Sequence, residues 1–413
     1  MEFIDELMDE LSPEDQRTLR RAQESGNGVT LRLIKALYGL KQGSREWNRV
    51  LMEWLVEQGF RQSDADPCLF IREAEAGTTY LAVYVDDLLY TGSDQTYLIA
   101  FPRLLEARFK CRHMGEAEWV LGIRITRDRA RGTVTMTQDQ FIKDLLHKNG
   151  LDDCRTTSTP AATERLNAHT DEPLADQAKY RSIVGGLLYL SNATRPDVAC
   201  AVSDLSRYVC SPKQPHWEAA IRVLRYLKGS RLVGITFGRQ PDQTLLGYTD
   251  ADWAGDVQSR RSTTGWIFLL FGGALSWRSK LQATVALSTA EAEYIALSSA
   301  AQEAMYLRTL CKDFNPKDFD SPDPDQAVVI HVDNQAAIAI AKNPAHHQRT
   351  KHIDTRHHFI REQVESKTIA LKYVPTNSMV ADMLTKNLRA PRLRQHRASV
   401  MGIPTSSPDC TLE

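Results

Sequence analysis

The segment from residue 79 to residue 91 is Thr79-Tyr80-Leu81-Ala82-Val83-Tyr84-Val85-Asp86-Asp87-Leu88-Leu89-Tyr90-Thr91. β-Branched and aromatic residues dominate on both sides of the two aspartates, and this pattern predicts a β-hairpin with both carboxylates at its tip. Adjacent acids inside an apolar, strand-forming segment are costly to bury unless a cation offsets their charge. A divalent metal at a phosphoryl-transfer site is the usual reason to keep them. A solvated turn is the simpler interpretation, and the other motifs of the chain favour metal binding over it.

Length and composition predict a multidomain intracellular protein. The chain has 413 residues, enough for two or three domains with substantial cores. Its formal net charge of −1 argues against a chain that coats nucleic acid by bulk charge, although local basic grooves are compatible with it. The seven cysteines form no Cys-x-x-Cys pair, which argues against a zinc ribbon or a disulfide framework. An acidic N-terminus and the lack of an apolar run of membrane-spanning length predict a soluble protein of the cytoplasm or nucleus, neither secreted nor membrane-bound.

Shifts in composition divide the chain into six predicted segments. They are an acidic helical N-terminal arm (1–28), a region of mixed strands and helices (29–153), a linker (154–179), a helical region (180–243), an α/β unit (244–390) and a C-terminal tail (391–413). The linker is predicted because it is rich in Thr, Ala, Asp and Pro and poor in large apolar residues. Within the arm, Ser12 followed by Pro13 and two acids predicts the start of a helix.

Four acids of the α/β unit lie where predicted strands end or helices begin: Asp250, Glu293, Asp333 and Asp382. Each alone is an ordinary residue for the end of a strand or the start of a helix. Together, four carboxylates at element ends of one unit suit two Mg²⁺ ions about 3.5–4 Å apart, which activate water and stabilise the leaving oxygen in phosphodiester hydrolysis. Oxygen-only ligands favour Mg²⁺ or Mn²⁺ over zinc.

A capping box decides which acid of the predicted helix is the candidate ligand. Glu291 lies three residues after Ser288, and this spacing lets its side chain cap the helix. Helix capping therefore explains Glu291 without any catalytic role. Glu293 is the next acid and borders an apolar stripe, so we expect it to point toward the sheet.

These residues resemble the reverse transcriptase–ribonuclease H portion of a copia-type LTR retrotransposon Pol polyprotein, from about residue 33 to residue 401. The motifs that carry the resemblance are Lys35-Ala36-Leu37-Tyr38-Gly39-Leu40-Lys41-Gln42 with Arg45 and Trp47, Tyr84-Val85-Asp86-Asp87, Leu121-Gly122-Ile123, Arg195-Pro196-Asp197, Gly247-Tyr248-Thr249-Asp250-Ala251-Asp252-Trp253, Ser288-Thr289-Ala290-Glu291-Ala292-Glu293-Tyr294 and Val332-Asp333-Asn334. Their order along the chain makes a chance match negligible.

The resemblance implies a fold and an activity. It implies an α/β and α+β multidomain protein, with a partial reverse-transcriptase palm and the start of the thumb in residues 29–153. Residues 180–243 would form a helical connection, and residues 244–390 a ribonuclease H-like α/β domain with a mixed sheet. The implied activity is RNA-directed DNA polymerase with ribonuclease H. The implied partners are an RNA–DNA hybrid, an RNA template with a DNA primer, and deoxynucleotide triphosphates.

The resemblance also assigns site residues. Asp86 and Asp87 match polymerase metal-site residues, whereas Asp250, Glu293, Asp333 and Asp382 match the four metal-binding acids of ribonuclease H. The segment with Gly39, Lys41 and Gln42 matches the loop that contacts the template and the incoming nucleotide. The implied cofactor is Mg²⁺, with Mn²⁺ as an alternative.

One departure from the family pattern concerns the polymerase. Family members carry another catalytic aspartate on a strand ahead of the segment that begins at Lys35. Asp5, Asp9 and Asp15 of this chain lie on helical patterns instead. Because two-metal polymerisation needs that third carboxylate, we expect the chain to be a truncated copy or a mispredicted gene whose polymerase is inactive. We expect Mg²⁺-dependent cleavage of RNA in RNA–DNA hybrids to survive.

A cluster of histidines lies among basic residues between positions 346 and 361. Its members are His346, His347, His352, His357 and His358, with Arg349, Lys351, Arg356 and Arg361. A zinc site is one interpretation, but the cluster lacks cysteine and His-Glu-x-x-His spacing. Contact with a nucleic-acid backbone, above all by Lys351 and Arg356, is a second interpretation, and an ordinary solvated face is the third.

Two other functions compete with the ribonuclease H interpretation. The chain could be a non-catalytic nucleic-acid-binding relic of a transposable element. It could also be an integrase-type nuclease, which shares the domain fold but uses three acids. The hairpin with Asp86 and Asp87, and the lack of a His/Cys zinc module, argue against the integrase.

Overall fold

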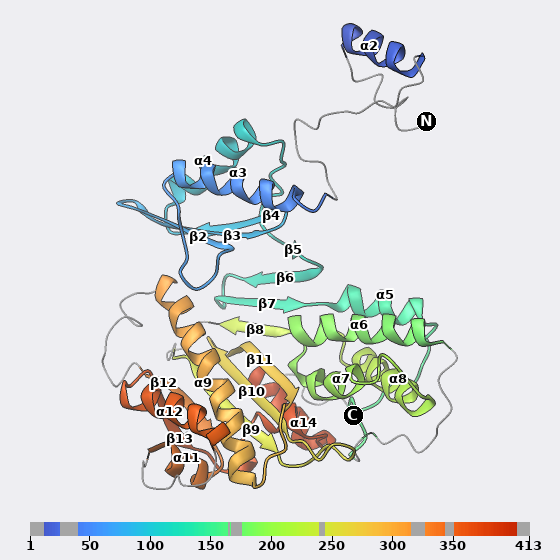
Figure 1. Ribbon diagram of the computed structural model, residues 1–413, viewed down its shortest axis with the longest axis vertical. Helices are drawn as coiled ribbons and strands as arrows, with labels where there is room; N and C mark the ends of the chain where they lie inside the picture. Colours follow the sequence, from blue (N-terminus) through green and yellow to red (C-terminus); the bar gives the residue numbers. More distant parts are fainter. Residues whose placement is uncertain are drawn as a thin grey trace. The chain divides into compact units, whose positions relative to one another are not determined.

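The structure is a computed structural model that describes residues 12–24, 40–163, 166, 176–238, 244–314, 327–342 and 351–402. The chain divides into two compact units (Figure 1). The smaller unit contains residues up to Ser63 together with Pro67–Arg108, and the larger unit contains Asp64–Asp66 and the chain from Phe109 onward. The predicted segment 29–153 therefore contributes to both units. No helix among the described residues is both long and apolar enough to cross a membrane.

The smaller unit is built on an antiparallel sheet in the order β1-β2-β3-β4. Its strands are β1 (Arg61–Gln62), β2 (Leu69–Ala74), β3 (Gly77–Tyr84) and β4 (Asp87–Gly92), and its helices are α2 (Pro13–Glu24), α3 (Gly43–Glu57) and α4 (Gln95–Arg108). Helix α2 begins where the sequence predicts, since Ser12 Oγ accepts a hydrogen bond from the Asp15 backbone N–H at 3.2 Å. Helices α3 and α4 lie on one side of the sheet (Figure 1), where Phe101 is fully buried and contacts the rings of Trp54 and Tyr90.

The predicted hairpin is confirmed. Strands β3 and β4 pair in antiparallel register, and Tyr84 and Asp87 are the last paired residues. Val85 and Asp86 form the two-residue connection, and Val85 has a φ of 53°, a left-handed conformation that a β-branched residue rarely adopts. On β3 the side chains of Leu81 and Val83 are buried while their neighbours are more exposed, as the two-residue period of a strand dictates.

The larger unit contains a second antiparallel sheet and a group of helices. The sheet has the order β5-β6-β7-β8. Its strands are β5 (Trp119–Val120), β6 (Ile123–Asp128), β7 (Thr133–Thr137) and β8 (Ile235–Gly238). The helices are α5 (Asp139–Lys148), α6 (Gln177–Ala193), the 3₁₀ helix η1 (Pro196–Val198), α7 (Ala199–Ser206) and α8 (Gln214–Gly229). Most described residues of the segment 180–243 are thus helical, and β8 lies near the end of that segment.

A five-stranded mixed sheet forms the second half of the larger unit, in the order β11-β10-β9-β12-β13. Its strands are β9 (Leu246–Asp252), β10 (Thr263–Leu270), β11 (Gly273–Leu281), β12 (Val328–Val332) and β13 (Ile369–Tyr373). Strands β9, β10 and β11 are antiparallel, whereas β12 is parallel to both β9 and β13. The predicted α/β and α+β multidomain fold is confirmed, and the predicted mixed sheet lies in the segment 244–390.

Helices cover both faces of this sheet. They are α9 (Thr289–Phe314), α11 (Gln335–Lys342), α12 (Lys351–Glu365), the 3₁₀ helix η4 (Thr376–Ser378), α13 (Asp382–Thr385) and α14 (Ala390–Val400). Trp266 and Phe268 of β10 pack with apolar residues of α9, α11 and α12, while Ile267 between them packs on the opposite face with α13 and α14. The same core as Ile267 contains Leu187 of α6 and Leu224 of α8. The helices of residues 180–243 and the mixed sheet therefore share one continuous core.

A buried ion pair explains the motif Arg195-Pro196-Asp197. The guanidinium of Arg195 donates two hydrogen bonds to the Asp197 carboxylate, at 2.8 and 2.7 Å, and both side chains are fully buried. Tyr226 of α8 donates to Asp197 at 2.6 Å, and Arg397 of α14 donates to the Tyr226 hydroxyl at 3.1 Å. This motif thus connects α8 to α14, and its role in the described residues is structural.

Candidate metal centre

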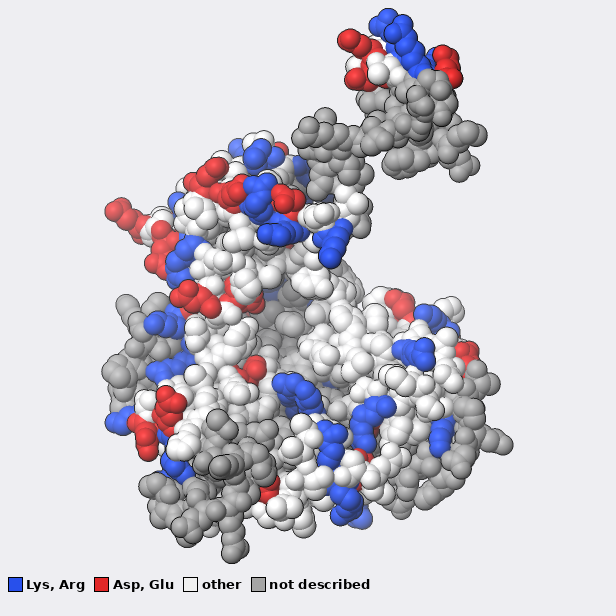
Figure 2. Space-filling view, in the orientation of Figure 1, with Lys and Arg blue, Asp and Glu red and all other residues white. Residues whose placement is uncertain are grey.

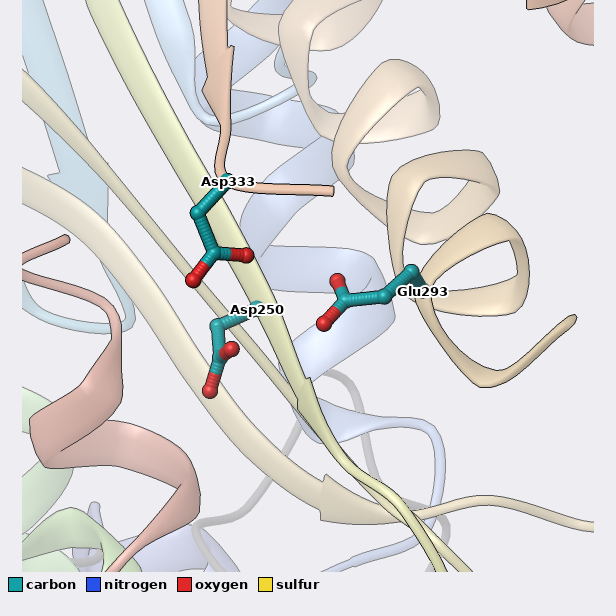
Figure 3. A group of neighbouring side chains, drawn as sticks. All are labelled: Asp250, Glu293 and Asp333. Atoms are coloured by element: carbon teal, nitrogen blue, oxygen red, sulfur yellow. The ribbon is translucent and has the colours of Figure 1, made fainter. Parts of the chain in front are cut away.

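Three of the predicted acids lie together near the carboxyl ends of β9 and β12, two interior strands of the mixed sheet. Oxygen atoms of Asp250, Glu293 and Asp333 all lie within 4.8 Å of one another. Figure 3 shows that the three side chains point toward a common position. Asp250 belongs to β9, Asp333 follows the last residue of β12, and Glu293 is on α9. Because β9 and β12 are parallel neighbours, their carboxyl ends lie at the same edge.

Helix α9 presents Glu293 to the sheet and keeps Glu291 at its N-terminus. The Glu291 backbone N–H donates to Ser288 Oγ at 3.1 Å, and Glu291 Oε2 accepts from the Leu287 N–H at 2.8 Å. This is the predicted capping interaction, and it accounts for Glu291. Glu293 is only 6% exposed and lies in the group with Asp250 and Asp333. The geometry therefore favours Glu293 over Glu291 as a metal ligand.

The three neighbouring carboxylates of Asp250, Glu293 and Asp333 repel one another when ionised, and a bound cation would offset this repulsion. Burial, together with the nearby carboxylates of Asp250 and Asp333, raises the pKa of Glu293 to about 9. Its Oε2 atom is buried and has no hydrogen-bond partner. A buried polar atom without a partner is costly, and a divalent cation between the three carboxylates would offset both penalties. The donor set is oxygen only, which suits hard cations such as Mg²⁺.

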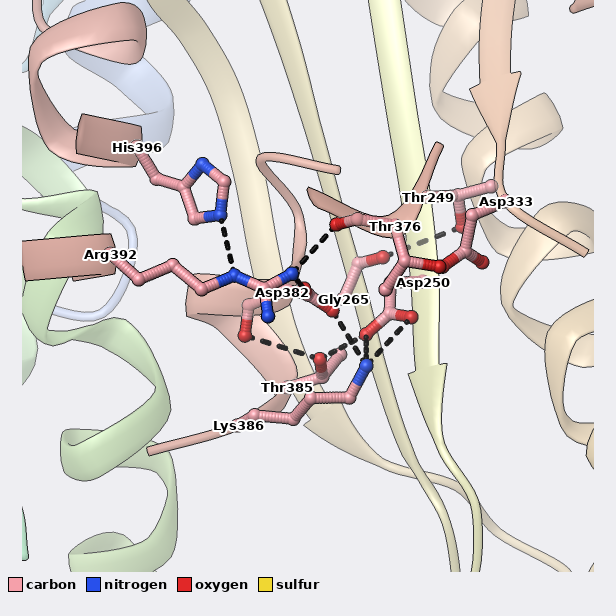
Figure 4. A network of polar contacts seen from close by, with 10 residues as sticks. All are labelled: Thr249, Asp250, Gly265, Asp333, Thr376, Asp382, Thr385, Lys386, Arg392 and His396. Carbon is pink, nitrogen blue, oxygen red and sulfur yellow. Dashed lines mark hydrogen bonds and ion pairs between the residues drawn. The ribbon is translucent and has the colours of Figure 1, made fainter. Parts of the chain in front are cut away.

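Asp382, the fourth predicted acid, lies on the other side of Asp250 and is paired with cationic side chains. Lys386 Nζ is 2.6 Å from Asp382 Oδ1 and 3.1 Å from Asp250 Oδ2. Arg392 donates to the second oxygen of Asp382, and the Thr385 hydroxyl donates to Asp250 (Figure 4). Asp382 is therefore near the cluster but is not one of the three acids that converge.

The charges around Asp382 shift the pKa values of both members of its ion pair. Burial and the neighbouring carboxylate of Asp250 raise the pKa of Asp382 to about 6, although Lys386 opposes the shift. Burial by itself lowers the pKa of Lys386, but Asp250 and Asp382 outweigh it and raise that pKa above its ordinary value. Lys386 is a site residue that sequence reasoning missed. Its spacing of four residues from Asp382 was the available signal, since residues i and i+4 of a helix face each other.

The predicted polymerase residues lie in the smaller unit. Asp86 is in the hairpin connection, Asp87 begins β4, and both are exposed. The Trp47 indole N–H donates to the Val85 carbonyl at 2.8 Å, which holds this turn against α3. Among the described residues, the acids that group within metal-binding distance are those around Asp250, and neither hairpin acid is among them.

Several other predicted residues are only partly described. Lys41 and Gln42 are exposed and lie just before α3, whereas Gly39 lies outside the described residues. Lys351 and Arg356 belong to α12, but their side chains lie outside the described part, as do His352 and His357. His346 and His347 are not described at all. The choice between zinc, backbone contact and a solvated face therefore stays open.

A family model described as reverse transcriptase (RNA-dependent DNA polymerase) matches residues 20–163. The chain is 38% identical over 368 residues to the Retrovirus-related Pol polyprotein from transposon TNT 1-94 of Nicotiana tabacum, covering 87% of this chain and 27% of the relative. It is 36% identical over 380 residues to the Retrovirus-related Pol polyprotein from transposon RE2 of Arabidopsis thaliana, covering 92% of this chain and 25% of the relative. The chain thus spans about a quarter of the length of these polyproteins.

A shorter relative is matched over most of its own length. It is the Putative transposon Ty5-1 protein of Saccharomyces cerevisiae, 32% identical over 273 residues, which cover 66% of this chain and 88% of the relative. Among solved structures, the LC11-RNase H1 isolated from compost is matched over 35% of this chain and 94% of its own, with a TM-score of 0.26 and 16% identity. At that TM-score it adds nothing to the fold assignment, which rests on the sheet topology.

Proposed function

The chain belongs to the family of copia-type retrotransposon Pol polyproteins, as a reverse transcriptase–ribonuclease H portion, and from this premise we propose that its mixed-sheet domain hydrolyses RNA in RNA–DNA hybrids. One observation carries the proposal. The buried carboxylate of Glu293 has an oxygen without a hydrogen-bond partner and faces the carboxylates of Asp250 and Asp333. A protein that did not bind a cation there would gain stability by losing one of these acids.

We propose Mg²⁺ as the cation, with Mn²⁺ as a substitute, because the three ligands offer only carboxylate oxygens. When bound, such an ion supplies a Lewis acid and lowers the pKa of a coordinated water. The chain's own residues orient the ligands. The Thr376 hydroxyl donates to Asp333 Oδ2 at 2.8 Å, and Thr385 donates to Asp250. Asp382 is proposed to act at the same site, through its contacts with Lys386 and Arg392.

Binding of the nucleic-acid backbone is proposed for basic residues of the same unit. On the face drawn in Figure 2, Lys and Arg side chains lie over the central part of the larger unit with few Asp or Glu side chains among them. Local basic surface of this kind contacts phosphates without reading sequence. We propose Lys351 and Arg356 of α12 as further phosphate contacts, on the sequence alone.

The family supports a second set of roles in the smaller unit. Asp86 and Asp87 would hold polymerase metals, and the segment with Gly39, Lys41 and Gln42 would contact an RNA template, a DNA primer and a deoxynucleotide triphosphate. Among the described residues, no third acid forms a metal-binding group with Asp86 and Asp87. We therefore propose hybrid cleavage, and not primer extension, as the activity of the 413-residue chain.

The test is cleavage of a labelled RNA strand annealed to DNA, with Mg²⁺ withheld and then added. Wild-type protein should cleave only when Mg²⁺ is present, and Asp250→Asn and Glu293→Gln should lose nearly all cleavage. Glu291→Gln is the matched control, because it removes an acid from the same helix end but leaves the three-carboxylate group intact. An inactive Glu291→Gln beside a fully active Glu293→Gln would refute the assignment of the helix acid.

Non-catalytic binding of nucleic acid is the second candidate function. The observation that favours it is the occupation of both Asp382 oxygens by Lys386 and Arg392, which ties up one of the four family acids. Hybrid binding that is unchanged by Mg²⁺, without any cleavage after Mg²⁺ is added, would support this candidate.

A further inference from the structure

Lys386 lies between two buried carboxylates of the site. Its Nζ atom contacts Asp382 Oδ1 at 2.6 Å and both oxygens of Asp250, at 3.2 and 3.1 Å (Figure 4). The side chains of Asp250 and Asp382 are each 1% exposed, whereas that of Lys386 is 36% exposed. The lysine therefore reaches inward and places its charge where two acids meet.

Neighbouring residues hold both carboxylates in place around the ammonium group. Lys386 follows Asp382 by four residues at the end of α13, so the two side chains lie on the same face. Arg392 of α14 binds the other oxygen of Asp382, and the Thr385 hydroxyl donates to Asp250. The position between the acids is thus built by contacts from two helices.

Charge compensation differs on the two sides of Asp250. On the side of the cluster, Glu293 has a buried oxygen without a partner, and Asp333 accepts a hydrogen bond from the neutral hydroxyl of Thr376. On the other side, Asp382 is paired with both Lys386 and Arg392. Basic side chains therefore already neutralise the carboxylate of Asp382, whereas an added cation would be needed to neutralise the carboxylates on the side of Glu293.

Lys386 Nζ contacts oxygen atoms of Asp250 and Asp382, the two acids that would have to hold a second metal ion beside the three-carboxylate cluster. Two-metal nucleases hold their ions about 3.5–4 Å apart. In this chain Asp250 is shared between the carboxylate cluster and the ammonium group. An ammonium group is a compact point charge with N–H donors, so it offers positive charge and hydrogen bonds to a phosphate but no Lewis-acid site.

We propose that Lys386 is a built-in cation that takes the place of a second divalent ion between Asp250 and Asp382. The site then holds a single divalent ion, among Asp250, Glu293 and Asp333. Lys386 is a positioning residue that sets how many ions the carboxylates accept. This inference rests on the proposed function, because it assumes that the three-carboxylate cluster binds a cation.

The experiment measures how many Mn²⁺ ions the full chain binds without nucleic acid, from the electron paramagnetic resonance signal of free Mn²⁺ during titration. All proteins in the titration carry Asp86→Asn and Asp87→Asn, so that the hairpin acids add no ion to the count, and the protein that is otherwise wild type should bind about one ion. Lys386→Met keeps the aliphatic length and removes the charge, so it should bind about two ions, whereas Lys386→Arg should stay at about one. Lys280→Met, at an exposed position of β11, is the matched control and should leave the stoichiometry unchanged.

A double variant shows where the added ion binds. In Lys386→Met the second ion should require Asp382, so the double variant Lys386→Met with Asp382→Asn should return to about one ion. Asp382→Asn alone should also bind about one. Because Lys386→Met leaves two buried carboxylates facing each other, its folding is checked by thermal unfolding with and without Mn²⁺. Mn²⁺ should raise its melting temperature by more than that of the wild type.

The outcomes separate this inference from the proposed function. Two ions on wild-type protein, falling to one in Asp382→Asn, would overturn the role of Lys386 while leaving hybrid cleavage intact. A folded Lys386→Met that still binds one ion would overturn it as well. Wild-type protein that binds no Mn²⁺ and cleaves no hybrid would refute the proposed function, and the inference with it.

Discussion

Thr249 of β9 and Val332 of β12 are register partners on parallel strands. The next residue after each is an aspartate, so Asp250, which lies inside β9, and Asp333, which directly follows β12, come close together. Successive strand residues point to opposite faces, and a shift of this register by one residue would therefore separate the two carboxylates. The site depends on strand pairing as much as on the acids themselves.

Removing the hydroxyl that orients Asp333 should weaken metal binding. Thr376 Oγ1 donates to Asp333 Oδ2 at 2.8 Å, and loss of a partner that orients a metal ligand typically costs roughly 10–100-fold in metal affinity. Thr376→Val should therefore lower Mn²⁺ affinity by about that factor, as measured by titration. Thr309→Val, at an exposed position of α9, is the control. Equal affinity of Thr376→Val and wild type would contradict a role for the hydroxyl.

Without metal, the stability of the larger unit should fall as pH rises above about 5. The folded pKa of Glu293 is about 9, above the value of 4.5 for the free side chain, so the folded state keeps a proton that the unfolded state has lost. Asp382, raised to about 6, acts in the same direction. The stabilising contribution is complete below the unfolded pKa and is lost as pH rises through the folded pKa.

Urea unfolding in EDTA at pH 6 and pH 8.5 measures this effect. The free energy of unfolding should be lower at pH 8.5 in the wild type, and the difference should shrink in Glu293→Gln or with saturating Mg²⁺. A wild-type difference as small as that of Glu293→Gln would show that Glu293 is ionised in the folded protein.

Breaking the buried pair between Arg195 and Asp197 should destabilise the larger unit strongly. Both side chains are fully buried, and removal of one partner leaves an uncompensated charge, which costs about 3–5 kcal/mol. Arg195→Met should therefore lower the free energy of unfolding by about that amount in urea titration. The control is Arg129→Met, because the pair between Arg129 and Glu116 is exposed and contributes little. Similar losses in both variants would contradict this account.

The 413-residue chain should not extend primers. Asp86 and Asp87 are exposed at the hairpin tip, and among the described residues no third carboxylate completes a metal site with them. Two-metal nucleotide transfer needs that ligand. Purified protein should incorporate no dTTP on poly(rA)/oligo(dT). Incorporation that disappears in Asp86→Asn would prove the expectation wrong.

The basic residues of α12 should contribute to nucleic-acid affinity without sequence preference. Each phosphate contact releases counterions, so affinity falls as salt rises, in proportion to the number of contacts. Changing Lys351 and Arg356 together to Ala should reduce the salt slope by about two contacts. A zinc site predicts the reverse, namely zinc in the purified protein, lost in His352→Ala, and an unchanged salt slope. Elemental analysis and a salt titration of hybrid binding decide between them.

Local patterns in the sequence determined much of the site. The apolar flanks of Asp86 and Asp87 determined the hairpin, and the capping box at Ser288 distinguished Glu291 from Glu293. Strand patterns placed Asp333 correctly just after a strand, whereas the strand predicted to end at Asp250 continues to Asp252. These features follow from hydrogen bonds and side-chain periodicity within a few residues, and such short-range effects are visible in a single sequence.

Only the tertiary structure decided how the charges pair and how the helices pack. Lys386 follows Asp250 by 136 residues, yet the two form an ion pair with a distance of 3.1 Å between Nζ and Oδ2. Likewise, the helices of residues 180–243 share a core with the mixed sheet, although composition predicted a separate segment. Ion pairing and apolar burial depend on distance through space. No periodicity in the sequence encodes which distant element will supply a counter-charge to Asp250.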